Sequence, residues 1–225
     1  MQQKTQQHLS LFDVPAGRDN NRAQYGRSLM TAGSSMRHFN HRPIVFLDIE
    51  TTGGSPHGPL ASRITEIGAL RVERGKVAGT FSQLVDPQCR IPTFITGLTG
   101  ISDSMVKGKP VFADVADDLR SFLDGAIFVS HVVQFDYGFI KAEYARLDQA
   151  FNMDRLCSVH LDRRLYPEQP RHGLDRVIER LELTVANRHR AYDDAEVLWK
   201  VFEHEYTKDP VELFRAMEKL LVKCR

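Results

Sequence analysis

An apolar run that ends in two acidic residues places the strongest constraint on how this 225-residue chain can fold. The run Ile44–Leu47 follows Pro43 and leads into Asp48 and Glu50, with Thr-Thr-Gly-Gly over 51–54. Four consecutive apolar residues between turn-forming residues predict a strand that is buried on both faces of a sheet. Side chains alternate along a strand, so the two acids point the same way, roughly 7 Å apart.

These two carboxylates repel each other and lose hydration at the end of a buried strand, so a positive group is expected between them. A divalent metal ion is the simplest candidate. The alternative is that the strand ends at Leu47, which would leave both acids as solvated loop residues. Residues elsewhere in the chain are needed to distinguish the two interpretations.

Composition limits the class of protein. The chain is 42% hydrophobic and long enough for one sizeable core, so we expect one domain with appendages. Its three cysteines, Cys89, Cys157 and Cys224, form no C-x-x-C, which argues for a reducing cytoplasm and against disulfides or a thiolate zinc site. We find neither an apolar stretch near the ~20 residues of a membrane span nor a signal peptide, and expect a soluble cytoplasmic protein without a membrane partner.

Two parts are expected along the chain. Residues 1–42 lack periodicity and carry six Lys or Arg against two Asp, which predicts a flexible N-terminal arm. Residues 43–225 predict the folded domain. Strands are expected from residue 43 and over 64–72, 77–85 and 126–129, and helices over 111–123, 135–147, 158–165, 173–182, 190–206 and 210–222. A hairpin followed by interleaved helices and strands predicts an α/β fold with a mixed sheet covered by helices.

A third acid, Asp136, follows the strand predicted at 126–129 and lies at the start of the next helix. This edge of an open α/β sheet, where strands end, is the usual place for a functional site. Capping and the helix dipole also favour Asp in a first helical turn, and this is the structural alternative.

Helix geometry selects a fourth acid from an adjacent pair. The apolar stripe of the last-but-one helix comprises Ala191, Ala195, Leu198 and Phe202. Asp194 lies about 60–70° from the centre of that stripe, whereas Asp193 lies nearly opposite it. We therefore expect Asp194 to border the core and Asp193 to face solvent. His189 would lie at the entrance of the helix, near Asp194.

Four acids and one histidine on separate segments suit hydrolysis of a phosphodiester by a two-metal route. Carboxylates there hold two divalent ions about 3.5–4 Å apart, of which one activates water and the other stabilises the leaving oxygen. An imidazole with an ordinary pKa of about 6.5 is suited to taking the proton of that water. Oxygen ligands favour Mg²⁺ or Mn²⁺ over zinc.

Three segments, in this order, resemble the motifs of the DnaQ-like 3′–5′ exonucleases of the DEDD histidine type, which include bacterial DNA polymerase III proofreading subunits. The segments are 48–53, 131–136, and His189 with Asp194 five positions later. The resemblance covers about 43–205, and 64–69 and 91–101 agree with it. It implies a ribonuclease-H-like mixed sheet, antiparallel over its first three strands and flanked by helices.

The resemblance also implies roles for the acids and the histidine. Asp48 would bridge two Mg²⁺ or Mn²⁺ ions, Glu50 and Asp194 would complete one ion site, and Asp136 would support the other through a water. His189 would be the general base. In the sister group this base is a tyrosine four residues before the last Asp, where the present chain has Arg190.

Contacts to the terminal nucleotide are a further implication. Thr51, Thr52 and Phe135 match the positions that make these contacts in the family. Val132 departs from the pattern, because the family commonly has Asn there and Val cannot form the same hydrogen bonds. The departure concerns substrate positioning rather than metal binding.

The expected activity is removal of nucleoside 5′-monophosphates from the 3′ end of single-stranded or frayed DNA, in replication proofreading or repair on the bacterial nucleoid. Trimming of RNA by the same chemistry is the alternative, since the four acids do not read the sugar. A lesser alternative is a non-catalytic adaptor, which loss of an acid or of the histidine would indicate; none is missing. Whether the chain serves a replicative polymerase or acts alone stays open.

The N-terminal arm contains a second, independent motif. Gln7, Leu9, Leu11 and Phe12 resemble the peptide by which bacterial replication and repair proteins bind the sliding clamp. An extended peptide with a polar anchor and apolar residues can fill a surface groove. The alternative is an apolar patch that folds back on the domain.

Overall fold

The computed structural model describes residues 42–58 and 60–224. The predicted arm lies outside these residues apart from Arg42. The clamp-binding residues predicted there, Gln7, Leu9, Leu11 and Phe12, therefore also lie outside the described part of the chain.

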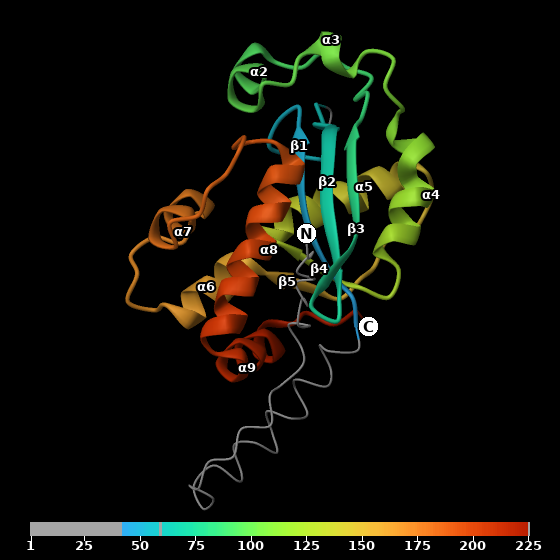
Figure 1. Ribbon diagram of the computed structural model, residues 1–225. Coiled ribbons are helices and arrows are strands. Elements are labelled where there is room, and N and C mark those ends of the chain that lie inside the picture. The colour runs from blue at the N-terminus through green and yellow to red at the C-terminus, as the bar shows by residue number, and fades with distance from the viewer. Residues whose placement is uncertain (1–41, 59, 225) are drawn as a thin grey trace, which may run out of the picture.

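A mixed five-stranded sheet with the strand order β3-β2-β1-β4-β5 forms the centre of the domain (Figure 1). Its strands are β1 (Ile44–Thr51), β2 (Ile64–Glu73), β3 (Lys76–Leu84), β4 (Ile127–Ser130) and β5 (Arg155–Cys157). Strand β2 pairs antiparallel with both β1 and β3, whereas β4 pairs parallel with β1 and β5 pairs parallel with β4. The predicted mixed sheet with an antiparallel hairpin is confirmed.

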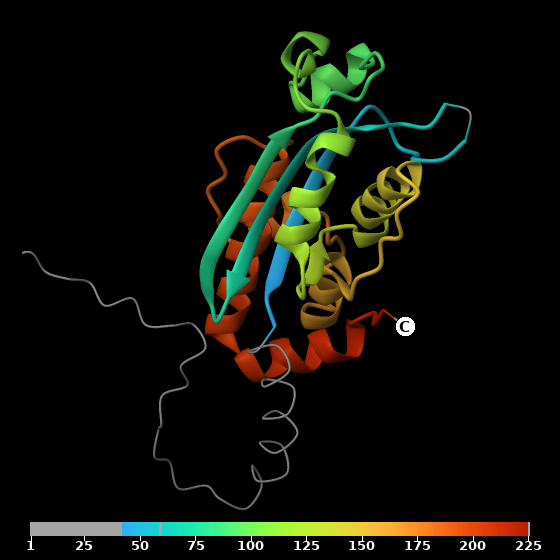
Figure 2. The same cartoon turned by 90° about the vertical axis from the view of Figure 1, so that its right-hand side faces the viewer.

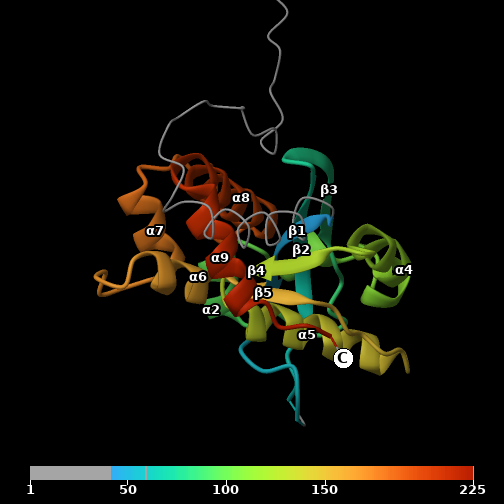
Figure 3. The same cartoon turned by 90° about the horizontal axis from the view of Figure 1, so that it is seen from below.

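Helices cover both faces of the sheet. On one face lie α4 (Phe112–Leu123) and α5 (Val133–Arg146), and on the other lie α6 (Ser158–Leu165), α8 (Ala191–Lys208) and α9 (Pro210–Leu220), as Figures 2 and 3 show. Helix α7 (Leu174–Arg180) lies on the side of α6 and α8 (Figure 1). The short α2 (Thr93–Thr99) and α3 (Asp103–Val106) lie beyond the end of the sheet at which β1 terminates (Figure 1).

Strand β1 is buried on both faces because its side chains alternate between two apolar cores. Val45, Leu47 and Ile49 pack in the core under α4 and α5. Ile44 and Phe46 pack in the core under α8 and α9. Successive side chains of a strand point to opposite faces, so each apolar residue of the run contributes to a core.

The same alternation places the two acids of β1. Asp48 and Glu50 share the parity of Phe46 and therefore lie on the α8 face of the sheet. Both belong to the strand, which continues to Thr51. The alternative in which the strand ends at Leu47 is wrong.

Three short elements were not predicted from the sequence. Helices α2 and α3 and strand β5 have seven, four and three residues, too few for a periodic pattern. The other predicted boundaries lie within two residues of those observed. Within the described ranges, the structure contains no helix that is long and apolar enough to cross a membrane.

Candidate active site

The end of β1 carries the first two acids of the site. Asp48 and Glu50 are half-buried, and in the register with β2 they face Gly68 and Glu66. The register slips by one residue between Glu50 and Thr51. Such an irregularity ends regular pairing and re-aims side chains, as is common next to active sites.

Asp136 comes from the opposite face of the sheet, in the first turn of α5. Its side chain is buried, with 4% of the residue exposed. A bidentate ion pair holds α5 in place, because Arg63, directly before β2, donates to both carboxylate oxygens of Glu143, over 2.8 and 3.0 Å. Glu143 is itself buried. The helix that carries Asp136 is therefore tied to the strand beside β1.

Asp194 lies in the first turn of α8 and is also buried. The start of α8 is attached to β2 by Glu66, which accepts hydrogen bonds from the Arg190 guanidinium and, at 3.0 Å, from the Ala191 backbone amide. Close packing is possible because β2 has glycine at position 68, where an added Cβ would lie 2.0 Å from the Tyr192 nitrogen. A carboxylate at the N-terminus of a helix is also favoured by the helix dipole.

His189 precedes α8 and faces the acids. Ligand atoms of Glu50, His189 and Asp194 all lie within 4.8 Å of one another. The backbone of His189 has φ +60°, in the left-handed region that non-glycine residues occupy infrequently. Strain of this kind is often found where a side chain is held for function.

Burial raises the pKa of each of the four acids, and neighbouring carboxylates raise those of Asp48 and Glu50 further. Burial, followed by repulsion from Asp136, Asp194 and Glu50, raises the pKa of Asp48 well above its usual value. Burial and the charge of Asp194 raise the pKa of Glu50 to about 8. Burial also raises the pKa of Asp136 to about 7 and raises that of Asp194. A dense, incompletely neutralised negative charge therefore surrounds the end of β1.

This donor set fits divalent metal ions. Four carboxylates supply hard oxygen atoms, and their raised pKa values indicate that the protein alone provides too little positive charge for them. Asp48, Glu50, Asp136 and Asp194 are the residues that would hold the ions. His189, at their edge, can act as a ligand or a base.

Arg188 supplies part of the missing positive charge. Its Nη1 forms an ion pair with Asp194, and its Nε and Nη2 each lie 2.8 Å from an oxygen of Asp175 in α7. It lowers the pKa values of Asp48, Glu50 and Asp194, opposing the larger effect of burial. No role for Arg188 was predicted from the sequence.

The predicted nucleotide contacts occupy the same end of the sheet. Thr51 and Thr52 are each 7% exposed, and their hydroxyls serve the local turn: Thr51 donates to the Gly53 carbonyl and Thr52 accepts from the Arg63 amide. Phe135 is half-buried and packs on Phe139 in α5. Contact of these three residues with a nucleotide stays a prediction.

Val132 and Asp193 also have defined places. Val132 is the N-cap of α5 and is 52% exposed, and its side chain has no polar group to satisfy the amides of the first turn.

Asp193 is half-buried rather than fully exposed, and its carboxylate lies 3.3 Å from the side-chain nitrogen of Asn187. Asp194 is among the buried residues of α8, as the helix geometry predicted, and Asp193 is not, although it does not face solvent as fully as expected.

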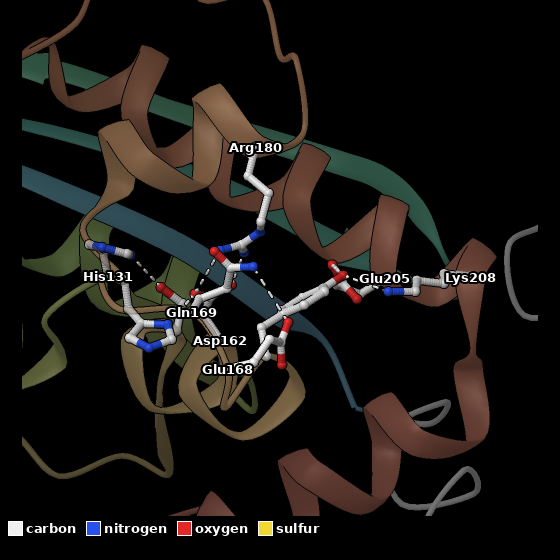
Figure 4. A network of polar contacts seen from close by, with 10 residues as sticks. His131, Asp162, Glu168, Gln169, Arg180, Glu205 and Lys208 are labelled. Carbon is white, nitrogen blue, oxygen red and sulfur yellow. Dashed lines mark hydrogen bonds and ion pairs between the residues drawn. The ribbon is translucent and has the colours of Figure 1, made fainter.

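A polar network fixes the elements beside the site (Figure 4). Asp162 of α6 accepts from Arg180 of α7 and lies 2.6 Å from Nδ1 of His172. Further along, the Tyr166 hydroxyl donates to Glu205 of α8 over 2.6 Å. His131, the first residue of the second motif, contacts Ser158 at 2.9 Å, and burial lowers its pKa to about 4. It is therefore a neutral, structural histidine near pH 7.

Comparison with known proteins identifies the family. The family model described as "RNase_T: Exonuclease" matches residues 45–202, which include the four acids and His189. The chain belongs to this exonuclease family. The predicted resemblance to exonucleases is thereby confirmed.

Curated relatives of the exonuclease domain are bacterial. The 3′-5′ exonuclease DinG of Bacillus subtilis (strain 168) is 38% identical over 164 residues, which are 72% of this chain and 17% of DinG. A DNA polymerase III PolC-type of Caldanaerobacter subterraneus is 37% identical over 158 residues, 70% of this chain and 11% of the polymerase. The chain thus spans less than a fifth of the length of these relatives.

Solved exonuclease structures share the fold. The nuclease domain of 3'hExo, described as a DEDDh family member bound to rAMP, superimposes with a TM-score of 0.65 at 16% identity, over 75% of this chain and 94% of that one. Exonuclease X in complex with 5′ overhanging duplex DNA gives 0.61 at 21% identity, over 77% and 99%. The predicted ribonuclease-H-like fold is confirmed.

Proposed function

We propose that this exonuclease domain is a divalent-metal-dependent 3′–5′ exonuclease that acts on single-stranded or frayed DNA ends. The observation that carries the proposal is the convergence of acids from β1, α5 and α8 beside His189. Each of these elements is anchored independently, by the sheet, by Arg63–Glu143 and by Arg190–Glu66. An arrangement so strongly charged and so firmly held is costly unless it binds cations.

The chain's own residues have separable roles in this proposal. Asp48, Glu50, Asp136 and Asp194 would hold two ions, Mg²⁺ or Mn²⁺. Bound there, such ions lower the pKa of water and stabilise charge on phosphate oxygens. His189 would accept the proton of the attacking water while the bond from phosphorus to the 3′ oxygen breaks. The products are a nucleoside 5′-monophosphate and a strand that is one residue shorter.

DNA is the favoured polymer because of the relatives' names. DinG is called a 3′-5′ exonuclease, and PolC-type proteins are DNA polymerases. RNA stays the alternative, since one structural neighbour is bound to rAMP. Thr51, Thr52 and Phe135 are proposed to contact the terminal nucleotide, because they lie at the end of β1 and the start of α5, beside the acids.

Parallel digestion of DNA and RNA tests the polymer. Matched single-stranded DNA and RNA oligonucleotides, incubated with the protein and Mn²⁺, should be shortened at different rates, with DNA faster. Asp48→Ala, which removes a shared carboxylate, should leave both intact. Faster loss of RNA would replace DNA by RNA in the proposal, and equal rates for Asp48→Ala and wild type would refute the assigned site.

Partners are a separate proposal. We propose that residues Gln7–Phe12 bind the bacterial sliding clamp, and that the domain works with a replicative polymerase or in repair on the nucleoid. Pull-down by the clamp should be lost with Leu11→Ala and Phe12→Ala combined. Equal recovery of wild type and variant would exclude this use of the motif.

A further inference from the structure

Arg188 lies between two carboxylates of different elements. It pairs with Asp194 of the acidic cluster on one side and with Asp175 of α7 on the other. The Asp194 side chain is 7% exposed, whereas that of Asp175 is 68% exposed. The guanidinium therefore connects a buried carboxylate of the site with an exposed carboxylate beside it.

Arg188 is a described basic residue whose charge acts on three of the four acids. It favours the charged forms of Asp48, Glu50 and Asp194. Arg190, two residues further along the chain, instead donates to Glu66. Glu66 also accepts from the Ala191 amide, so loss of the Arg190–Glu66 pair would loosen the start of α8. Arg188 makes no contact with Glu66 and pairs instead with the carboxylates of Asp194 and Asp175.

Occupation of Asp194 by Arg188 conflicts with coordination of a dication by the same carboxylate. A guanidinium and a dication a few ångströms apart repel each other strongly in a partly buried site, where water screens their charges poorly. The Asp175 link, which uses other nitrogens of Arg188, need not break. Arg188 can therefore leave Asp194 and stay bound to Asp175.

We propose that Arg188 is a positioning residue that neutralises Asp194 before cations bind and then, held by Asp175, binds a phosphate of the nucleic-acid strand. The inference rests on the proposed function, because it requires metal ions at the acids and a phosphate beside them. A planar guanidinium matches phosphate oxygens in bidentate geometry, which a lysine cannot reproduce. The released side chain would act where the strand enters, at the exposed Asp175 end.

Calorimetric titration of Mn²⁺ tests the first half. Arg188→Gln removes the competing cation, so Mn²⁺ should bind about tenfold more tightly than to wild type. Arg176→Gln is the matched control, because Arg176 pairs with exposed Glu179 on α7 and touches none of the four acids. This control should bind Mn²⁺ like wild type. Arg188→Lys, which keeps the charge, serves as a second variant if Arg188→Gln is poorly folded and should show little gain in Mn²⁺ affinity.

Binding of deoxyadenosine 5′-monophosphate in the presence of Ca²⁺ tests the second half. Arg188→Gln and Arg188→Lys should both weaken it, by about tenfold for Gln. Asp175→Asn should weaken nucleotide binding as well, because the tether is lost. Unchanged or weaker Mn²⁺ binding by Arg188→Gln, or unchanged nucleotide binding by that variant, would overturn the inference. The proposed function would still stand in that case, provided that the wild-type protein binds Mn²⁺. Wild-type protein that bound no Mn²⁺ would overturn both.

Discussion

At the scale of single residues, protons and cations compete for the acids at the end of β1. Glu50, with a pKa of about 8, and Asp136, with a pKa of about 7, hold protons near neutral pH because burial disfavours their charged forms, to which neighbouring carboxylates add for Glu50. Cations displace these protons on binding. The site should therefore bind metal more tightly as pH rises, and release protons as it does so.

The same pKa shifts predict how stability depends on pH. Unfolded, these groups titrate near 4.5 and 3.8, so between about pH 4 and 8 the folded metal-free protein holds more protons than the unfolded chain. The free energy of unfolding must then fall as pH rises through this window. Urea denaturation in EDTA should give a lower free energy of unfolding at pH 8 than at pH 6, and saturating Mg²⁺ should abolish the difference.

A single substitution checks the assignment of this pH dependence. Glu50→Gln removes one of the titrating groups and should make the stability profile in EDTA less steep, while raising the stability of the metal-free protein at pH 8. If wild type and Glu50→Gln showed the same slope between pH 6 and 8, burial of these charges would not be the cause.

At the scale of elements, the packing of α8 on β2 determines where Asp194 lies. Gly68→Ala would place a Cβ against the backbone of residues 191 and 192, which cannot move without shifting the start of α8. We expect a loss of about 2–4 kcal/mol in the free energy of unfolding and a large loss of nuclease activity. Urea denaturation and oligonucleotide digestion measure the two effects.

Gly138→Ala is the matched control for this substitution. Gly138 lies within α5, and an added Cβ there would meet no atom within 4 Å. Because alanine favours helix more than glycine does, stability should be unchanged or rise by up to about 1 kcal/mol. Equal effects of the two substitutions would contradict the close-packing account of Gly68.

Long periodic elements were predictable from the sequence, and short elements and side-chain partners were not. The run before Asp48 predicted a strand buried on both faces, and helix periodicity separated Asp194 from Asp193. In contrast, β5 has three residues, and its place is set by pairing with β4. Glu66 and Arg190 lie more than a hundred residues apart, and only the fold brings them together.

Two signals for the unassigned residues were nonetheless present. Glu66 stands in the mainly apolar segment from Ile64 to Leu70, where a buried acid requires a partner. Gly68 follows in the same strand, and glycine in a strand interior often marks a close backbone approach. Arg188 carried no comparable signal, because arginine is common on exposed loops and its partner in α7 depends on the tertiary structure.

At the scale of the whole molecule, the sheet brings distant segments to the end at which β1 terminates, and the helices hold them there. The acids of β1 and α5 come from opposite faces, and α8 closes the site from the side of α6 and α7 (Figure 1). Beyond the same end lies α2, which exposes Phe94 and Leu98.

Stepwise digestion of a 5′-labelled single-stranded DNA oligonucleotide tests the central claim, that these acids form a metal-dependent 3′–5′ exonuclease centre. With Mg²⁺ or Mn²⁺ the wild-type protein should produce a ladder of labelled products that shorten one nucleotide at a time from the 3′ end. Asp48→Asn and EDTA-treated wild type should leave the oligonucleotide at full length. A labelled mononucleotide as the first product, or the same ladder from Asp48→Asn, would contradict the account.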